Sequence, residues 1–264
     1  MEIRHPAVAD MFYPGKSAVL RQQVSQFLEQ ANPPNIGGRI KGLIAPHAGY
    51  VYSGPIAAYA YKSLENLDRE KDWKILLLGP SHQIPFSGAA VSEFEEWETP
   101  LGNVKVGDIR EKIKKTDLIK DIPGADSDEH SLEVQIPFLQ TVLQKFTIYP
   151  LVLGSVNSRL LAEELAEFCK EDDVLTVVSS DLSHYLGYED AKETDFETCE
   201  AISGLDTTKM DEIGDACGKN AILTLMHIAK KLKWKCKMLN YRNSGDTAGD
   251  KYRVVGYGAY AFYK

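Results

Sequence analysis

Residues 73–82 read WKILLLGPSH, an apolar run that ends in a glycine, a proline and then a histidine. A second run of the same kind, VLTVVSS, occupies residues 174–180. Strands that are apolar on both faces are typical of the centre of a parallel sheet, where helices cover both sides. These two segments therefore predict two central strands of an α/β sheet.

Strand-like and helix-like segments alternate along the whole chain of 264 residues. Parallel strands need long crossovers, which are usually helical, so this alternation predicts one mostly parallel central sheet with helices on both faces. Residues 88–106, with a PLG turn, predict a hairpin at the sheet edge, and without an evident linker we expect a single domain over 1–264. The expected strands are 39–45, 73–79, 147–153, 173–180, 235–241 and 252–263, and the expected helices are 16–31, 54–66, 131–145, 157–170, 189–203 and 218–231.

Composition narrows the classes of partner. The formal net charge is −8 and the only notably basic run, KKLKWKCK, is short, so we expect no nucleic-acid partner. No apolar run approaches the roughly 20 residues of a membrane span, and the N-terminus lacks the apolar core of a signal peptide. We expect no membrane association. The four cysteines form no CxxC pair, which favours a reducing, cytoplasmic location.

Four ionisable side chains follow the ends of four predicted strands: His47, His82, His184 and Asp246. The carboxyl ends of parallel strands meet at one sheet edge, where ligands bind. Two imidazoles and one carboxylate form a ligand set that suits Fe(II) and also Zn(II). The spacing alone leaves open whether these residues form a metal site or are unrelated polar residues at strand ends.

His130 has two interpretations. It lies in DSDEHSLE, where the acidic and hydroxyl residues fit the first turn of a helix. Alternatively, His130 and Glu133 face the same pocket, because residues three apart share a helix face.

Several strings, taken in order, resemble the Memo family along nearly the whole chain: PHAGYVYSG, LGPSH, DEHSLEVQIPFLQ, SSDLSHY and NSGD followed by VVGYGA. The N-terminal RHPAVADMFYPG resembles the opening of prokaryotic members. That family is similar in fold to the class III extradiol ring-cleaving dioxygenases. The resemblance therefore implies an α/β fold and a metal centre with two histidines.

The resemblance also assigns roles to single residues. It implies that His47 and His82 are metal ligands, that His184 is an acid/base histidine off the metal, and that His130 is a second pocket histidine. The third ligand is a cysteine in animal members. This chain has no cysteine there, and Asp246 is the nearest substitute, with Asp250 as the alternative. A carboxylate in place of a thiolate favours Fe(II), with Zn(II) as the alternative.

Three functional classes fit these features. The first is a metal-dependent oxidoreductase that acts on a small, aromatic or otherwise chelating substrate. The second is a non-catalytic module that binds a peptide or another ligand in the same pocket. The third is a hydrolase that uses Ser179, Ser180 or Ser183, although the GxSxG elbow is absent. Asp181 is expected to orient a histidine, and Cys217, before a predicted helix, is either a reactive thiol or a buried residue.

Overall fold

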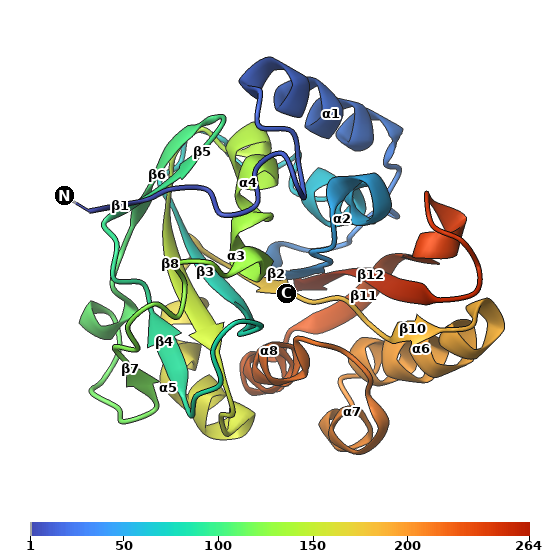
Figure 1. The fold of residues 1–264 in the computed structure, drawn as a ribbon. Coiled ribbons are helices and arrows are strands. Elements are labelled where there is room, and N and C mark those ends of the chain that lie inside the picture. Colours follow the sequence, from blue (N-terminus) through green and yellow to red (C-terminus); the bar gives the residue numbers. More distant parts are fainter. Residues whose placement is uncertain (1) are drawn as a thin grey trace.

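Four neighbouring parallel strands form the centre of the molecule (Figure 1). The computed structural model describes residues 2–264. The central strands lie in the order β8 (Phe146–Leu153), β3 (Trp73–Pro80), β9 (Val174–Ser179) and β2 (Ile40–Ala45). Nearly every residue of β3 and all of β9 are buried, as expected for strands covered on both faces. The two predicted central strands are confirmed.

Further strands, most of them paired antiparallel, extend this centre on both sides. Next to β2 lies β12 (Val254–Tyr263), which also pairs with β11 (Lys235–Asn243) and β10 (His184–Leu186). On the other side, the predicted hairpin forms from β5 and β6, and the second of these strands runs parallel to β8. The strands on this side are β1 (Ile3–Arg4), β4 (Ala89–Val91), β5 (Glu96–Thr99), β6 (Gly102–Val106) and β7 (Ile119–Lys120).

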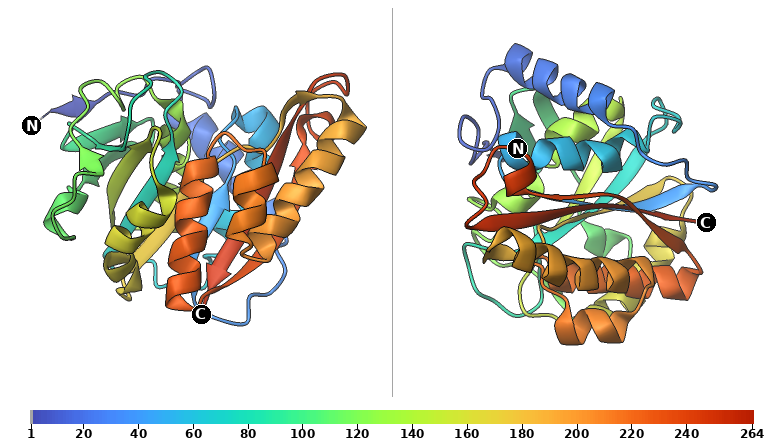
Figure 2. Two further views of the ribbon diagram at one scale, coloured as in Figure 1. Left: turned by 90° about the horizontal axis from the view of Figure 1, so that it is seen from below. Right: turned by 90° about the vertical axis from the view of Figure 1, so that its right-hand side faces the viewer.

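Helices cover both faces of the sheet, as the views in Figure 2 show, and the predicted fold class is confirmed. Each face has its own apolar core, one built around Tyr61 and Phe138 and the other around Phe168 and Met226. Among residues 2–264, we find no helix with the length and apolar character that a membrane span requires. One face carries α1 (Ser17–Gln30), α2 (Tyr50–Lys62), α3 (His130–Glu133) and α4 (Ile136–Val142); the other carries α5 (Ser158–Lys170), α6 (Tyr188–Ser203), α7 (Thr207–Ile213) and α8 (Lys219–Leu232).

Two helical regions differ from the expectation. The helix predicted over 131–145 is divided into α3 and α4, and Pro137, in the first turn of α4, has no N–H to continue a helix across the junction. The seven-residue α7 was not predicted; the Asp206 side chain caps it by accepting the Lys209 N–H. Short 3₁₀ turns occur at Ile109–Glu111 (η1) and Ser244–Asp246 (η2).

Candidate metal centre

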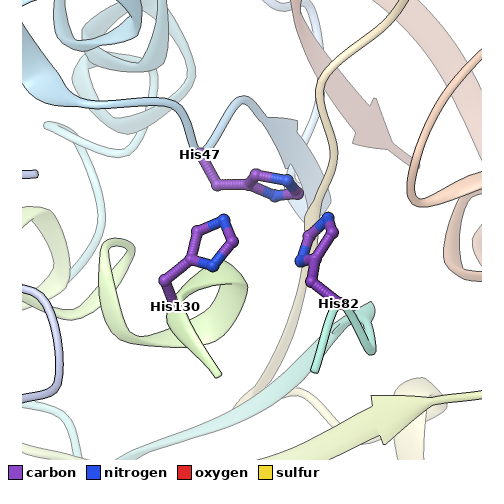
Figure 3. A group of neighbouring side chains, drawn as sticks. All are labelled: His47, His82 and His130. Carbon is purple, nitrogen blue, oxygen red and sulfur yellow. The ribbon is translucent and has the colours of Figure 1, made fainter. Parts of the chain in front are cut away.

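Three histidines from three separate segments face one another at the carboxyl edge of the sheet (Figure 3). His47 follows β2, His82 follows β3, and both strands flank β9, so their ends lie close together. His130 is the first residue of α3. One nitrogen from each ring lies within 4.8 Å of the other two, and the ring centroids are 5.2, 5.5 and 4.6 Å apart.

The start of α3 is tied to the end of β3, and this brings His130 to the other two histidines. The Ser131 hydroxyl donates to the Pro80 carbonyl at 2.9 Å. The Glu129 side chain caps α3 by accepting the Ser131 N–H at 2.9 Å. On its other side, the His130 ring packs against Phe12, with 4.7 Å between ring centroids.

The buried Glu129 carboxylate determines the orientation of the His82 ring. It lies 2.9 Å from His82 Nδ1 and also accepts the His82 backbone N–H at 2.5 Å. Burial by itself raises the pKa of Glu129, but the His82 and Ser131 hydrogen bonds outweigh burial and lower it to about 2. An ionised carboxylate only accepts hydrogen bonds, so Nδ1 carries a proton, and Nε2 is the nitrogen that the neutral ring can offer to a metal ion. A carboxylate in this position is typical of metal-binding histidines.

Ser179 orients His47 in a similar way. Its hydroxyl has one proton, which it donates to the Ser131 carbonyl at 2.5 Å. Both other partners must therefore donate to the serine oxygen: Gln135 Nε2 at 2.7 Å and His47 Nδ1 at 2.9 Å. His47 Nε2 is therefore the ring nitrogen that can act as a metal ligand. A fully buried hydroxyl with these contacts does not fit a hydrolytic nucleophile.

Burial favours the neutral form of two of the imidazoles, those of His47 and His130. It lowers the pKa of His47 well below its usual value, and the neighbouring histidines lower it further. Burial also lowers the pKa of His130, although Glu129 acts in the opposite direction. Neutral imidazole is the form that binds metals. Asp181 accepts the His47 backbone N–H at 2.8 Å, so it supports His47 through the main chain, and burial raises its own pKa to about 6.

Cys217 contacts the nitrogen of His47 that faces away from Ser179. Its Sγ lies 3.2 Å from His47 Nε2 and accepts the Asp181 N–H at 3.3 Å. Burial raises the pKa of Cys217 to about 12, which favours the neutral thiol over the reactive thiolate. A thiol that donates to Nε2 uses the same lone pair as a metal ion would, so the two interactions compete.

The three histidines line one part of a cleft of about 780 Å³. His184, at the start of β10, also lines this cleft but is not part of the three-histidine cluster. Four aromatic side chains form much of the remaining wall: Phe12, Tyr52, Tyr185 and Tyr257. The cleft therefore combines a potential metal centre, a separate imidazole and aromatic surface.

The structure does not bring Asp246 to the histidines. Its exposed carboxylate accepts the Asn243 N–H at 3.1 Å, as part of the capping box of η2, and separately accepts the Tyr188 hydroxyl at 2.5 Å. Asp250 does line the cleft, but it is also absent from the cluster, and its Oδ1 accepts the backbone N–H groups of Tyr252 and Arg253. The third side chain beside His47 and His82 is instead His130. Turn chemistry of this kind could not be deduced from the loop sequence.

Other supporting residues were not identified from the sequence. The sequence marks Glu129 only as one of the acidic residues before a predicted helix, and its position beside His130 is the one available signal. Glu133 was considered as a pocket residue, but it is fully buried and accepts hydrogen bonds from Arg4, Tyr13 and the N-terminal backbone. These roles depend on contacts between residues more than 40 positions apart.

The sheet with helices on both faces and the histidine cluster at its carboxyl edge together define an α/β protein with a candidate metal centre. Residues 4–261 match the family model described as Memo-like protein, and the chain belongs to that family. It is similar to proteins named "MEMO1 family protein" from several organisms. The relative from Sulfolobus acidocaldarius is 38% identical over 97% of both chains, that from Caldivirga maquilingensis 36% over all of both chains, and that from Aquifex aeolicus 36% over 97% of this chain and 98% of its own.

Proposed function

We propose that the protein binds one divalent metal ion through His47, His82 and His130, and that it is a metal-dependent oxidoreductase acting on a small molecule. The observation that carries the proposal is the convergence of three ring nitrogens within 4.8 Å of one another at a cleft. The ligand set differs from the one expected from sequence, because His130 takes the place given to Asp246.

The donor set fits a first-row transition metal. Imidazole suits iron, zinc and copper, and two of the three rings are oriented by Glu129 and Ser179. We propose Fe(II), with Zn(II) as the alternative. Three protein ligands leave further positions for substrate and O₂, and a bound iron ion would supply the redox chemistry.

The chain's own residues would bind the substrate and move its protons. His184 is the candidate acid/base, because it lines the cleft without belonging to the cluster. The tyrosines and Phe12 offer flat apolar surface, which favours an aromatic substrate. We also propose a cytoplasmic location, where a reducing environment would keep the four free thiols reduced, and no nucleic-acid or membrane partner.

Metal binding is tested by metal analysis of protein purified anaerobically without an affinity tag. We expect one divalent ion per chain. His47→Ala, His82→Ala and His130→Ala should each lower the affinity for the metal ion by at least about tenfold. A loss of this size is found even when a residue that hydrogen-bonds to a ligand is replaced. Asp246→Ala is the control and should retain wild-type affinity. Wild-type affinity in His130→Ala, or loss of metal in Asp246→Ala, would contradict the proposed ligand set.

The oxidoreductase assignment needs a separate test. Nitric oxide, an analogue of O₂, should change the electron paramagnetic resonance spectrum of the ferrous protein, and catechol should change it again. His184→Ala should keep its metal and lower turnover of any substrate by roughly 10²–10⁴-fold. If metal-loaded protein responds to neither nitric oxide nor catechol, the alternative function is favoured, a module that binds a peptide or another ligand without chemistry.

A further inference from the structure

Arg253 lies on the wall of the same cleft as the three histidines. Its guanidinium carbon is 5.0 Å from the centre of the Tyr185 ring, and Tyr185 also lines the cleft. Arginine stacks on aromatic faces and still presents the N–H groups at its edge to a ligand. The stack therefore holds the Arg253 guanidinium at the cleft wall and leaves its N–H groups available to a ligand.

A backbone irregularity helps to place this pair. In the antiparallel pairing of β10 with β12, His184 lies opposite Val255 and Leu186 opposite Val254, so Tyr185 is an extra residue. Its φ angle is +60°, in the left-handed region that a bulky residue rarely adopts. Bulges next to binding sites redirect side chains. Here the bulge lies opposite the start of β12, directly after Arg253, and the two side chains stack.

The charge of Arg253 is not neutralised by the protein. Within the described range, 2–264, its guanidinium has no carboxylate within 4.0 Å and no hydrogen bond, whereas Arg4, Arg39 and Arg110 all form ion pairs. The nearby acid Asp250 uses its Oδ1 to accept the backbone N–H groups of Tyr252 and Arg253 itself. Asp250 thus shapes the turn that carries Arg253.

Arg253 is also the only lysine or arginine among the described residues that line the cleft. The acids in the same wall, Asp181 and Asp250, already accept backbone N–H groups. A ligand that enters the cleft therefore meets the histidine cluster on one side and one unpaired guanidinium on another.

We propose that Arg253 is a specificity-determining residue that binds an anionic group of the substrate. The substrate class is then a small metal-chelating acid, whose oxygen donors face the histidine cluster and whose carboxylate accepts hydrogen bonds from Arg253. The part of the inference that concerns metal chelation rests on the proposed function. The role of Arg253 in charge selection is independent of any redox reaction.

The test compares two probes that differ in charge. Protocatechuate is a catechol that carries a carboxylate, and its primary amide has nearly the same shape without the charge. Calorimetric titration into the zinc-loaded protein measures binding without turnover, because zinc has no redox chemistry. We expect the acid to bind about tenfold more tightly than the amide. This preference is at the low end for a hydrogen bond between charged groups, because water around the exposed Arg253 weakens the interaction.

Arg253→Gln should abolish this preference and leave binding of the amide unchanged. The matched control is Lys251→Gln. Lys251 lies in the same loop as Arg253 and also contacts an aromatic ring, that of Tyr188, but it does not line the cleft. This control should keep the full preference. A second variant, Tyr185→Gly, removes the stacking partner at a position whose backbone suits glycine, and should reduce the preference without loss of metal.

The outcomes separate this inference from the proposed function. If the protein binds zinc but binds the acid and the amide equally, the role of Arg253 is overturned while the metal centre stands. If neither Fe(II) nor Zn(II) binds, the metal centre fails, and the same titrations on metal-free protein then decide whether Arg253 selects the acid. Equal loss of preference in Arg253→Gln and Lys251→Gln would also overturn the assignment.

Discussion

The direction of its hydrogen bond with Ser179 decides which ring nitrogen of His47 can bind a metal ion. Ser179 has only one proton, and the Ser131 carbonyl receives it, so His47 must donate from Nδ1. The same logic applies to His82, which faces an acceptor-only carboxylate. At this scale the candidate centre depends as much on the partners of the imidazoles as on the imidazoles themselves.

Ser179→Ala should therefore weaken metal binding although Ser179 is not a ligand. Without the hydroxyl, the His47 ring loses the acceptor that selects its tautomer, and we expect affinity to fall by roughly 10–100-fold. Competition with a chelating dye measures this change. Ser53→Ala is the control, because Ser53 is also buried and donates to the Ala48 carbonyl without touching a histidine ring. Equal affinities in the two variants would refute the role of Ser179.

At the scale of elements, the N-terminal segment is anchored to α3 by the buried carboxylate of Glu133. It accepts hydrogen bonds from the Arg4 guanidinium at 2.6 Å, the Tyr13 hydroxyl at 2.5 Å, and the backbone N–H groups of Ala7 and Val8. This network fixes the segment that contains Phe12, the residue packed on His130. The site therefore depends on an element that contributes no candidate ligand.

Arg4→Met should destabilise the fold strongly. It leaves the Glu133 charge buried with one partner fewer, and breaking a buried ion pair costs about 3–5 kcal/mol. Arg39→Met removes an arginine from an exposed ion pair with Asp172 and should cost less than about 1 kcal/mol. Urea denaturation of the two variants measures the free energies of unfolding. Similar losses in both would show that burial of the Arg4 pair is not what stabilises the segment.

At the scale of the whole molecule, the candidate centre couples stability to pH. The pKa of Glu129 falls from its usual 4.5 to about 2 in the folded protein, since hydrogen bonds from His82 and Ser131 outweigh burial. A carboxyl group with a depressed folded pKa stabilises the fold above its unfolded pKa, and this contribution disappears as the pH falls toward the folded pKa.

Glu129→Gln should consequently reduce stability near neutral pH but not in acid. The shift corresponds to about 3 kcal/mol at pH 7, and the difference between wild type and variant should shrink as pH falls from about 5 toward 2. Urea denaturation of both proteins across this pH range provides the measurement. A difference that stays constant with pH would mean that the ionised carboxylate is not the stabilising form.

The strands and most helices could be predicted because hydrophobic periodicity is a property of consecutive residues. The runs at 73–79 and 173–180 have the apolar character of buried strands whatever surrounds them. The division between α3 and α4 and the short α7 were missed, since Pro137 can also fit within a helix start and the seven residues of α7 are too few to show a helical period. His47 and His82 could be placed at one sheet edge because parallel strands align their carboxyl ends.

The sequence by itself determined the α/β class, the family and the edge of the sheet where the histidines meet. Only the tertiary structure decided which side chains complete the cluster: His130 lies beside His47 and His82, whereas Asp246 accepts hydrogen bonds from the Asn243 N–H and the Tyr188 hydroxyl. The proton positions on the imidazoles likewise depend on Glu129 and Ser179, which come from other segments. The physical reason is that side-chain partners are selected by distance in the folded chain, and periodicity carries no information about contacts between segments so far apart.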